Sequence, residues 1–185
     1  HLSIRRQRQM CIRDRARTEH EAFSLPPEPA AGHRGVDLGS VVAHLGRTLP
    51  PDSILTNGAG NYSVWLHRFY AYRRGRTELA PTCGAMGYGL PAAVAASLRH
   101  PGRQVVCMAG DGCFLMYPQE LATAAEYGAR LIVLVANNGM YGTIRMHQER
   151  RHPGRVSGTR LQGPDYVMLA LSLIHISEPT RPLYI

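Results

Sequence analysis

The chain has 185 residues, of which 44% are hydrophobic, enough for one globular domain with a packed core. The formal net charge is +8, and all 21 basic residues are arginine. The absence of lysine excludes a P-loop, a lysine Schiff base and a pyridoxal phosphate anchor. Half of the net charge falls within residues 1–15 and the remainder is scattered, so we expect no nucleic-acid partner.

No apolar run approaches the roughly 20 residues of a membrane span. The arginine-rich start also lacks the apolar segment of a secretory signal, and we expect no membrane partner. The four cysteines form neither a CxxC pair nor a framework spacing. Reduced thiols and a cytoplasmic location are therefore the expectation.

The two ends of the chain differ from the middle. Residues 1–15 and 171–185 continue no pattern of the core and resemble translated sequencing-adapter DNA, so we expect non-native tails there. A real basic arm and a real frayed tail are the alternative. Residues 16–35, rich in Pro, Gly and Ala, are predicted to form a linker to a preceding domain. The domain itself would span residues 36–170, truncated at its C-terminal end.

Within residues 36–170, helical and extended patterns alternate. We expect helices over residues 36–49, after the turn at 57–61, and within 83–97, 118–127 and 140–150. Strands are expected over residues 53–56, 104–109 and 131–136, with an extended stretch at 77–81. The strands are uniformly apolar, which predicts an α/β fold with a doubly wound parallel sheet and helices on both faces. Such sheets bind ligands at the carboxyl ends of their strands.

Two polar motifs stand where apolar strands end. Asp111, between two glycines, follows the strand at 104–109, and Asn138 follows the strand at 131–136. Their carboxylate and amide oxygens suit Mg²⁺, with a main-chain carbonyl, water and phosphate oxygens completing the shell. Gly110 and Gly112 would let the backbone approach a diphosphate, and the following helix could direct N–H groups at it. A tight turn and a helix cap are the alternative interpretation.

These motifs resemble the signature of thiamine diphosphate enzymes. Across residues 36–170, three further stretches are similar to the large subunit of acetolactate synthase, in its C-terminal diphosphate-binding domain: 57–65, 84–93 and 119–123. The resemblance implies thiamine diphosphate and Mg²⁺ as cofactors. It also implies an enzyme that decarboxylates a pyruvate-like 2-oxo acid and transfers or releases the resulting acyl-anion equivalent.

The resemblance assigns a role to each matching residue. Asp111, Asn138 and the backbone carbonyl of Met140 would hold Mg²⁺. The Met86 side chain would wedge under the cofactor and bend it; filling the core is the alternative for this methionine. The remaining residues expected around the cofactor are Gly60, Asn61, Tyr62, Gly84, Ala85, Gly110, Gly112, Cys113, Tyr141 and Gly142.

Two departures from the family pattern limit the resemblance. The activating glutamate of the family lies in an N-terminal pyrimidine-binding domain, normally on a neighbouring subunit of a homodimer or homotetramer. Neither Glu78 nor Glu120 corresponds to it, so we expect no catalytic residue and no turnover in this chain alone. His147 stands where acetolactate synthases carry a tryptophan that helps to select the acceptor. His147 and Thr143 are therefore candidate substrate contacts, although a histidine here is more often simply exposed.

Several alternatives stay open. Within the family, enzymes of the benzoylformate decarboxylase, oxalyl-CoA decarboxylase and aldehyde lyase types are runners-up. An NAD-binding domain is a different class, suggested by Gly58 and Gly60 after a strand with Glu78 farther on; Ser63 replaces its third glycine. A non-catalytic cofactor-binding fragment is another. FAD, which acetolactate synthases hold mainly through a middle domain, is neither predicted nor rejected from this chain.

Overall fold

The computed structural model describes residues 2–26 and 35–174. The chain forms two compact units. The first comprises His1–Thr48 with Trp65–Ala71, and the second comprises Leu49–Val64 with Tyr72–Ile185. Within the described residues, no helix is long and apolar enough to cross a membrane.

The first unit opens with a long exposed helix, α1 (Leu2–Phe23). Residues 16–23, which we expected in a linker, continue this helix instead. Arg15 and Arg17 each pair with a glutamate four residues on, at 2.7 and 2.9 Å, and such pairs favour a helix. The helix-breaking prolines begin only at Pro26. The part of the expected linker at 27–34 lies outside the described residues.

Two further helices contribute to this unit, α2 (Leu38–Thr48) and the later part of α3 (Asn61–Phe69). Helix α2 begins at Leu38 because the Asp37 carboxylate accepts the Ser40 N–H at 2.6 Å, which caps the first turn. The prolines at 50 and 51 follow its end. The apolar spacing expected over residues 36–49 is therefore confirmed as a helix that is slightly shorter.

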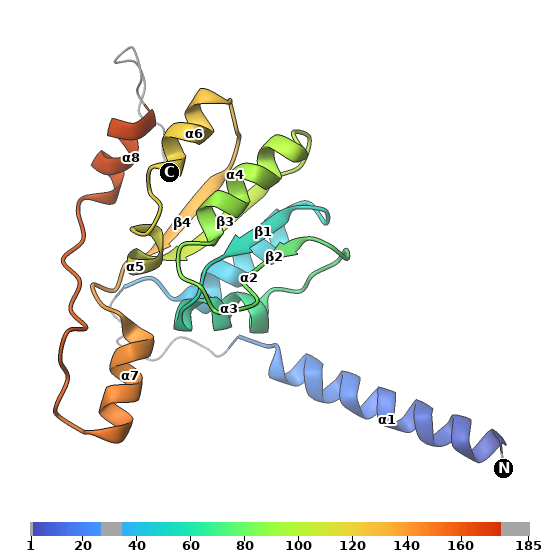
Figure 1. Ribbon diagram of the computed structural model, residues 1–185. Helices are drawn as coiled ribbons and strands as arrows, with labels where there is room; N and C mark the ends of the chain where they lie inside the picture. Colours follow the sequence, from blue (N-terminus) through green and yellow to red (C-terminus); the bar gives the residue numbers. More distant parts are fainter. Residues whose placement is uncertain (1, 27–34, 175–185) are drawn as a thin grey trace. The chain divides into compact units, whose positions relative to one another are not determined.

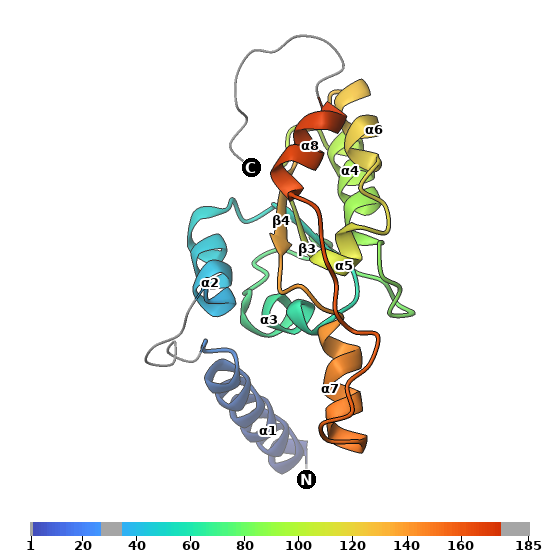
Figure 2. The ribbon, with the colours of Figure 1, turned by 90° about the vertical axis from the view of Figure 1, so that its left-hand side faces the viewer.

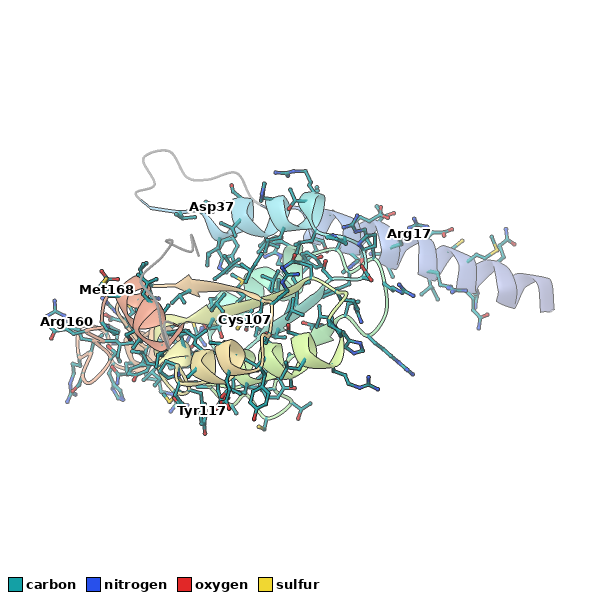
Figure 3. All side chains as sticks on the ribbon, turned by 90° about the horizontal axis from the view of Figure 1, so that it is seen from above. Arg17, Asp37, Cys107, Tyr117, Arg160 and Met168 are labelled. Atoms are coloured by element: carbon teal, nitrogen blue, oxygen red, sulfur yellow. The ribbon has the colours of Figure 1, made fainter. Side chains whose placement is uncertain are left out.

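The second unit is built on a four-stranded parallel sheet in the order β2-β1-β3-β4 (Figure 1). The strands are β1 (Ile54–Asn57), β2 (Glu78–Leu79), β3 (Val105–Gly110) and β4 (Ile132–Ala136). Every residue of β1 and β3 is buried. Cys107, labelled in Figure 3, pairs with Thr56 on one side and Val133 on the other. The parallel pairing predicted from the uniformly apolar strands is thus confirmed.

Helices α4 (Gly89–Arg99), α6 (Glu120–Glu126) and α8 (Tyr166–Ile174) lie side by side over one face of this sheet (Figures 1 and 2). Leu90, Leu121 and Ala170, one from each helix, join the strands in the main core cluster. Helix α8 runs past residue 170, where we expected the domain to end. The α/β fold of the doubly wound class is confirmed.

Two helices carry the polar ends of the strands. Helix α5 (Asp111–Phe114) is a single turn directly after β3, and α7 (Gly142–Arg151) follows the loop after β4. Within the predicted segment 83–97, the helix begins only at Gly89. Gly84 and Gly87 have φ values of +69° and +85°, left-handed conformations that a helix does not continue through.

Candidate functional site

The candidate site lies where β1, β3 and β4 end. Because these strands are parallel and in register, their carboxyl ends meet at one edge of the sheet. The Asn57–Gly60 turn, the start of α5 and the loop before α7 all leave from this edge. The structure therefore brings the two predicted motifs to one place.

Asp111 is the centre of this arrangement. It is 3% exposed and is the first residue of α5, rather than part of an open turn. Its Oδ1 accepts the Gly112 N–H at 2.8 Å and its Oδ2 accepts the Gly139 N–H at 2.7 Å. The second bond joins the end of β3 to the loop after β4, where Gly139 has a φ of +64°. Each carboxylate oxygen retains a lone pair for a further partner.

The loop after β4 offers two more oxygens. Asn138 is exposed, and its Oδ1 accepts the Met140 N–H at 3.1 Å. The Met140 carbonyl accepts the Gly142 N–H at 3.0 Å. The described residues contain no cluster of three or more His, Cys, Asp or Glu side chains. A single carboxylate with neutral oxygens fits a Mg²⁺ ion whose remaining ligands come from a diphosphate and water.

The glycines beside Asp111 make room for aromatic rings. A Cβ on Gly110 would lie 2.9 Å from the Tyr62 ring, and a Cβ on Gly112 would lie 2.6 Å from the Tyr141 ring. We expected these glycines to make room for a diphosphate. In the structure, they also make room for the rings of Tyr62 and Tyr141. The helix there, α5, has only four residues, and the Asp111 carboxylate itself accepts the Gly112 N–H.

Tyr62 and Cys113 both accept hydrogen bonds from backbone N–H groups of other segments. The Tyr62 hydroxyl accepts the Gly58 N–H at 3.1 Å, and the Cys113 sulfur accepts the Gly87 N–H at 3.1 Å. Burial raises the pKa of Tyr62, and its hydrogen bond with Cys113 raises it further. Both side chains are therefore hydrogen-bonded within the protein. The connection ties the segment before α4 to the start of α5.

The segment at Gly84, Ala85 and Met86 is less enclosed. Gly84 and Ala85 are exposed, and Met86 is partly buried. No atom lies within 4 Å of a Cβ built on Gly84, so this backbone borders open space. The wedge role of Met86 stays a prediction.

Asn61 and Thr143 meet across the site. The Thr143 hydroxyl accepts the Asn61 N–H at 3.1 Å and donates to Asn61 Oδ1 at 3.0 Å. The Met146 sulfur lies 3.6 Å from Asn61 Nδ2. These contacts place the first turn of α7 beside the start of α3. His147, the other candidate substrate contact, is exposed.

A segment that the sequence did not single out supports the loop after β4. Tyr141 N–H donates to the Thr159 carbonyl and Leu161 N–H to the Gly139 carbonyl, both at 2.9 Å. Tyr166, farther along, packs edge-on against Phe114 with ring centroids 5.8 Å apart. Burial raises the pKa of Tyr166, and the negative charge of Asp111 adds to this effect. No local pattern signals these contacts, because each joins distant parts of the chain.

Comparison with known proteins agrees with this geometry. The sequence profile described as "Thiamine pyrophosphate enzyme, C-terminal TPP binding domain" matches residues 58–180. The acetolactate synthase large subunit of Corynebacterium glutamicum is 37% identical over 139 residues, 72% of this chain and 22% of the relative. That of Parasynechococcus marenigrum is 39% identical over 161 residues, 86% of this chain and 26% of the relative.

A solved structure is similar as well. The thiamine diphosphate-dependent 4-hydroxybenzoylformate decarboxylase of Rhodococcus jostii superposes with a TM-score of 0.73 at 30% identity. The match covers 80% of this chain and 28% of that protein. The chain thus spans about a quarter of the length of the relatives it matches.

Proposed function

Because the chain belongs to the thiamine pyrophosphate enzymes, as their C-terminal TPP-binding domain of the acetolactate synthase-like type, we propose that it holds the cofactor through Mg²⁺. Asp111, Asn138 and the backbone carbonyl of Met140 are the proposed metal ligands. A diphosphate bound to this ion supplies the remaining negative charge that a single carboxylate leaves open.

The position of Asp111 carries this proposal. Its carboxylate is buried and oriented by two backbone N–H groups from separate segments, at 2.8 and 2.7 Å. A carboxylate held in this way needs no rearrangement to receive a cation. The neighbouring oxygens of Asn138 and Met140 belong to the loop that the same carboxylate holds in place.

The other site residues are proposed to bind and orient the cofactor. Gly60, Asn61 and Tyr62 on one side and Tyr141 and Gly142 on the other are proposed to border the diphosphate. The open backbone at Gly84 and Ala85 is proposed to contact the aminopyrimidine, with Met86 under the cofactor. Bound thiamine diphosphate supplies a nucleophilic carbon and an electron sink.

The proposed reaction is decarboxylation of a 2-oxo acid, followed by transfer or release of the acyl group. This chain has no candidate for the activating glutamate, which we assign to a pyrimidine-binding domain of a neighbouring subunit. The active form is therefore proposed to be a homo-oligomer of a longer polypeptide. The 185-residue chain by itself is expected to bind the cofactor without turnover.

Calorimetry tests the cofactor and metal together. The chain is titrated with thiamine diphosphate, with and without Mg²⁺, and separately with NAD. We expect saturable binding, one cofactor per chain, only when thiamine diphosphate and Mg²⁺ are both present. Equal affinity in the presence of EDTA would contradict the metal site, and binding of NAD alone would contradict the function. Decarboxylation of pyruvate by the isolated chain would contradict the requirement for a second domain.

A further inference from the structure

Helix α7 begins after the loop that follows β4 and leads away from the sheet (Figure 1). Thr143, in its first turn, is bonded to both the backbone and the side chain of Asn61. Met146, one turn later, also contacts Asn61. One side of α7 therefore faces the start of α3, where the diphosphate is proposed to bind.

The opposite side of α7 is occupied by the returning chain. Gln148 donates to the Ser157 carbonyl at 2.9 Å and accepts the Ser157 N–H at 3.0 Å. The Glu149 carboxylate accepts the Gly154 N–H at 3.0 Å. At about 100° per residue, these two side chains project away from Thr143. The Thr143 side of the helix is thus bonded to Asn61, and the opposite side is bonded to the returning chain.

His147 and Arg150 lie on the side of α7 that begins with Thr143. They follow Thr143 by four and seven residues, which are about 6 and 10 Å along a helix axis. Both are exposed. The only carboxylate of α7, Glu149, is on the other side and is bonded to Gly154. Among the described ion pairs, none engages Arg150.

The segment around Arg150 is also positively charged. Residues 142–160 contain five arginines and a single acidic residue. Arg160, labelled in Figure 3, pairs with Met140 in an isolated β-bridge and is exposed, as are Arg151 and Arg155. Positive charge beside the proposed cofactor site attracts anionic ligands, and a guanidinium binds carboxylate and phosphonate oxygens through two parallel hydrogen bonds.

We infer that the 2-oxo acid substrate carries a second anionic group at the end away from the reacting carbonyl, and that Arg150 binds this group with His147 beside it. The inference rests on the proposed function and specifies the class of its substrate. The shared chemistry is a distal anion, which a second carboxylate or a phosphonate can supply.

The test uses the full-length enzyme that contains this domain. Initial rates are measured with 2-oxoglutarate and 2-oxopentanoate, which have five carbons each and differ in the distal carboxylate, and with 3-phosphonopyruvate. We expect kcat/KM for 2-oxoglutarate or 3-phosphonopyruvate to exceed that for 2-oxopentanoate by roughly tenfold or more. Whichever anion is preferred identifies its source.

Variants distinguish a specific contact of Arg150 with the substrate from the general effect of positive charge. Arg150→Gln should lower the preference for the anionic substrate roughly tenfold, mainly through KM, and leave 2-oxopentanoate turnover unchanged. His147→Gln should give a smaller change in the same direction. Arg155→Gln removes the same charge from the same segment and should leave the preference almost unaltered. Thiamine diphosphate titration of each variant confirms that the domain is folded.

The possible failures are distinguishable. Equal use of the two five-carbon substrates, unaffected by Arg150→Gln, would overturn the distal-anion inference and leave the proposed function intact. Equal losses in Arg150→Gln and Arg155→Gln would overturn the specific contact. Cofactor binding without turnover of any 2-oxo acid would overturn the proposed function and the inference with it.

Discussion

The start of α5 and helix α7 border the same site, but they are held in different ways. All four residues of α5 are buried, and its Asp111 is bonded to the backbone of two segments. Helix α7 has no buried residue and is held through side-chain bonds to a returning loop. The chain therefore holds the Asp111 side of the site through buried backbone contacts and the α7 side through exposed side-chain contacts.

Asp111→Ala should have the largest effect. It removes the carboxylate and leaves the N–H groups of Gly112 and Gly139 without their partner, which costs about 1–3 kcal/mol for the buried Gly112 group and less for the partly buried Gly139 group. Affinity for thiamine diphosphate with Mg²⁺ should fall by more than roughly 100-fold. Calorimetry and urea denaturation measure the two effects. Glu126→Ala, an exposed acid on α6, is the matched control; similar binding by both variants would remove Asp111 from the metal site.

Gly112→Ala should have the second largest effect, because its added Cβ crowds the turn that contains Asp111. The added Cβ would lie 2.6 Å from Tyr141 Cε1. We expect a loss of about 1–3 kcal/mol in the free energy of unfolding and weaker cofactor binding. The control is Gly102→Ala, where no atom lies within 4 Å and a change within about 0.5 kcal/mol is expected. Equal stability of the two variants would show that the turn is not rigid.

The buried thiol of Cys107 should make the free energy of unfolding depend on pH. Burial raises the pKa of its thiol from 9.0 to about 12. Between these values the unfolded chain loses the proton first, so the folded state binds more protons there. The free energy of unfolding should therefore fall as the pH rises across this window, by at most about 1.4 kcal/mol per pH unit from this group.

Denaturation at pH 7.5, 9.0 and 10.0 measures the slope. Cys107→Ala should show a shallower alkaline decline than the unmodified chain, whatever its stability at neutral pH. Cys11→Ala, at an exposed position, should keep the original slope. Parallel declines in the three proteins would argue against the raised pKa of Cys107.

Gln148→Ala should have the smallest effect on stability and tests the α7 side. It removes both bonds to Ser157, which lie at the surface, so a loss of about 1 kcal/mol or less is expected. The loop bonded to Tyr141 should loosen, and hydrogen exchange at the Tyr141 N–H should accelerate. Gln119→Ala, also exposed, serves as the control. An unchanged exchange rate at Tyr141 would mean that the returning loop does not support the loop after β4.

The sequence by itself determined the sheet and the position of the two motifs. Uniformly apolar runs at 104–109 and 131–136 predicted parallel strands, and the polar residues Asp111 and Asn138 marked their carboxyl ends. The family resemblance was also readable from these local stretches, and the matched residues 58–180 agree with it. Local periodicity suffices for such predictions because a strand or helix repeats within a few residues. Over residues 16–23 the structure shows a helix within the expected linker, where exposed Arg–Glu pairs favour it.

Only the tertiary structure decided what each site residue touches. It turned Asp111 into the first residue of α5 and bonded it to Gly139, and it placed the Tyr62 ring against Gly110. It also brought Thr159 to the loop at Tyr141 and bonded α7 to Asn61 on one side and to Ser157 on the other. These contacts join residues from separate elements. Their geometry follows from how the packed strands and helices meet at the sheet edge, which no local pattern encodes.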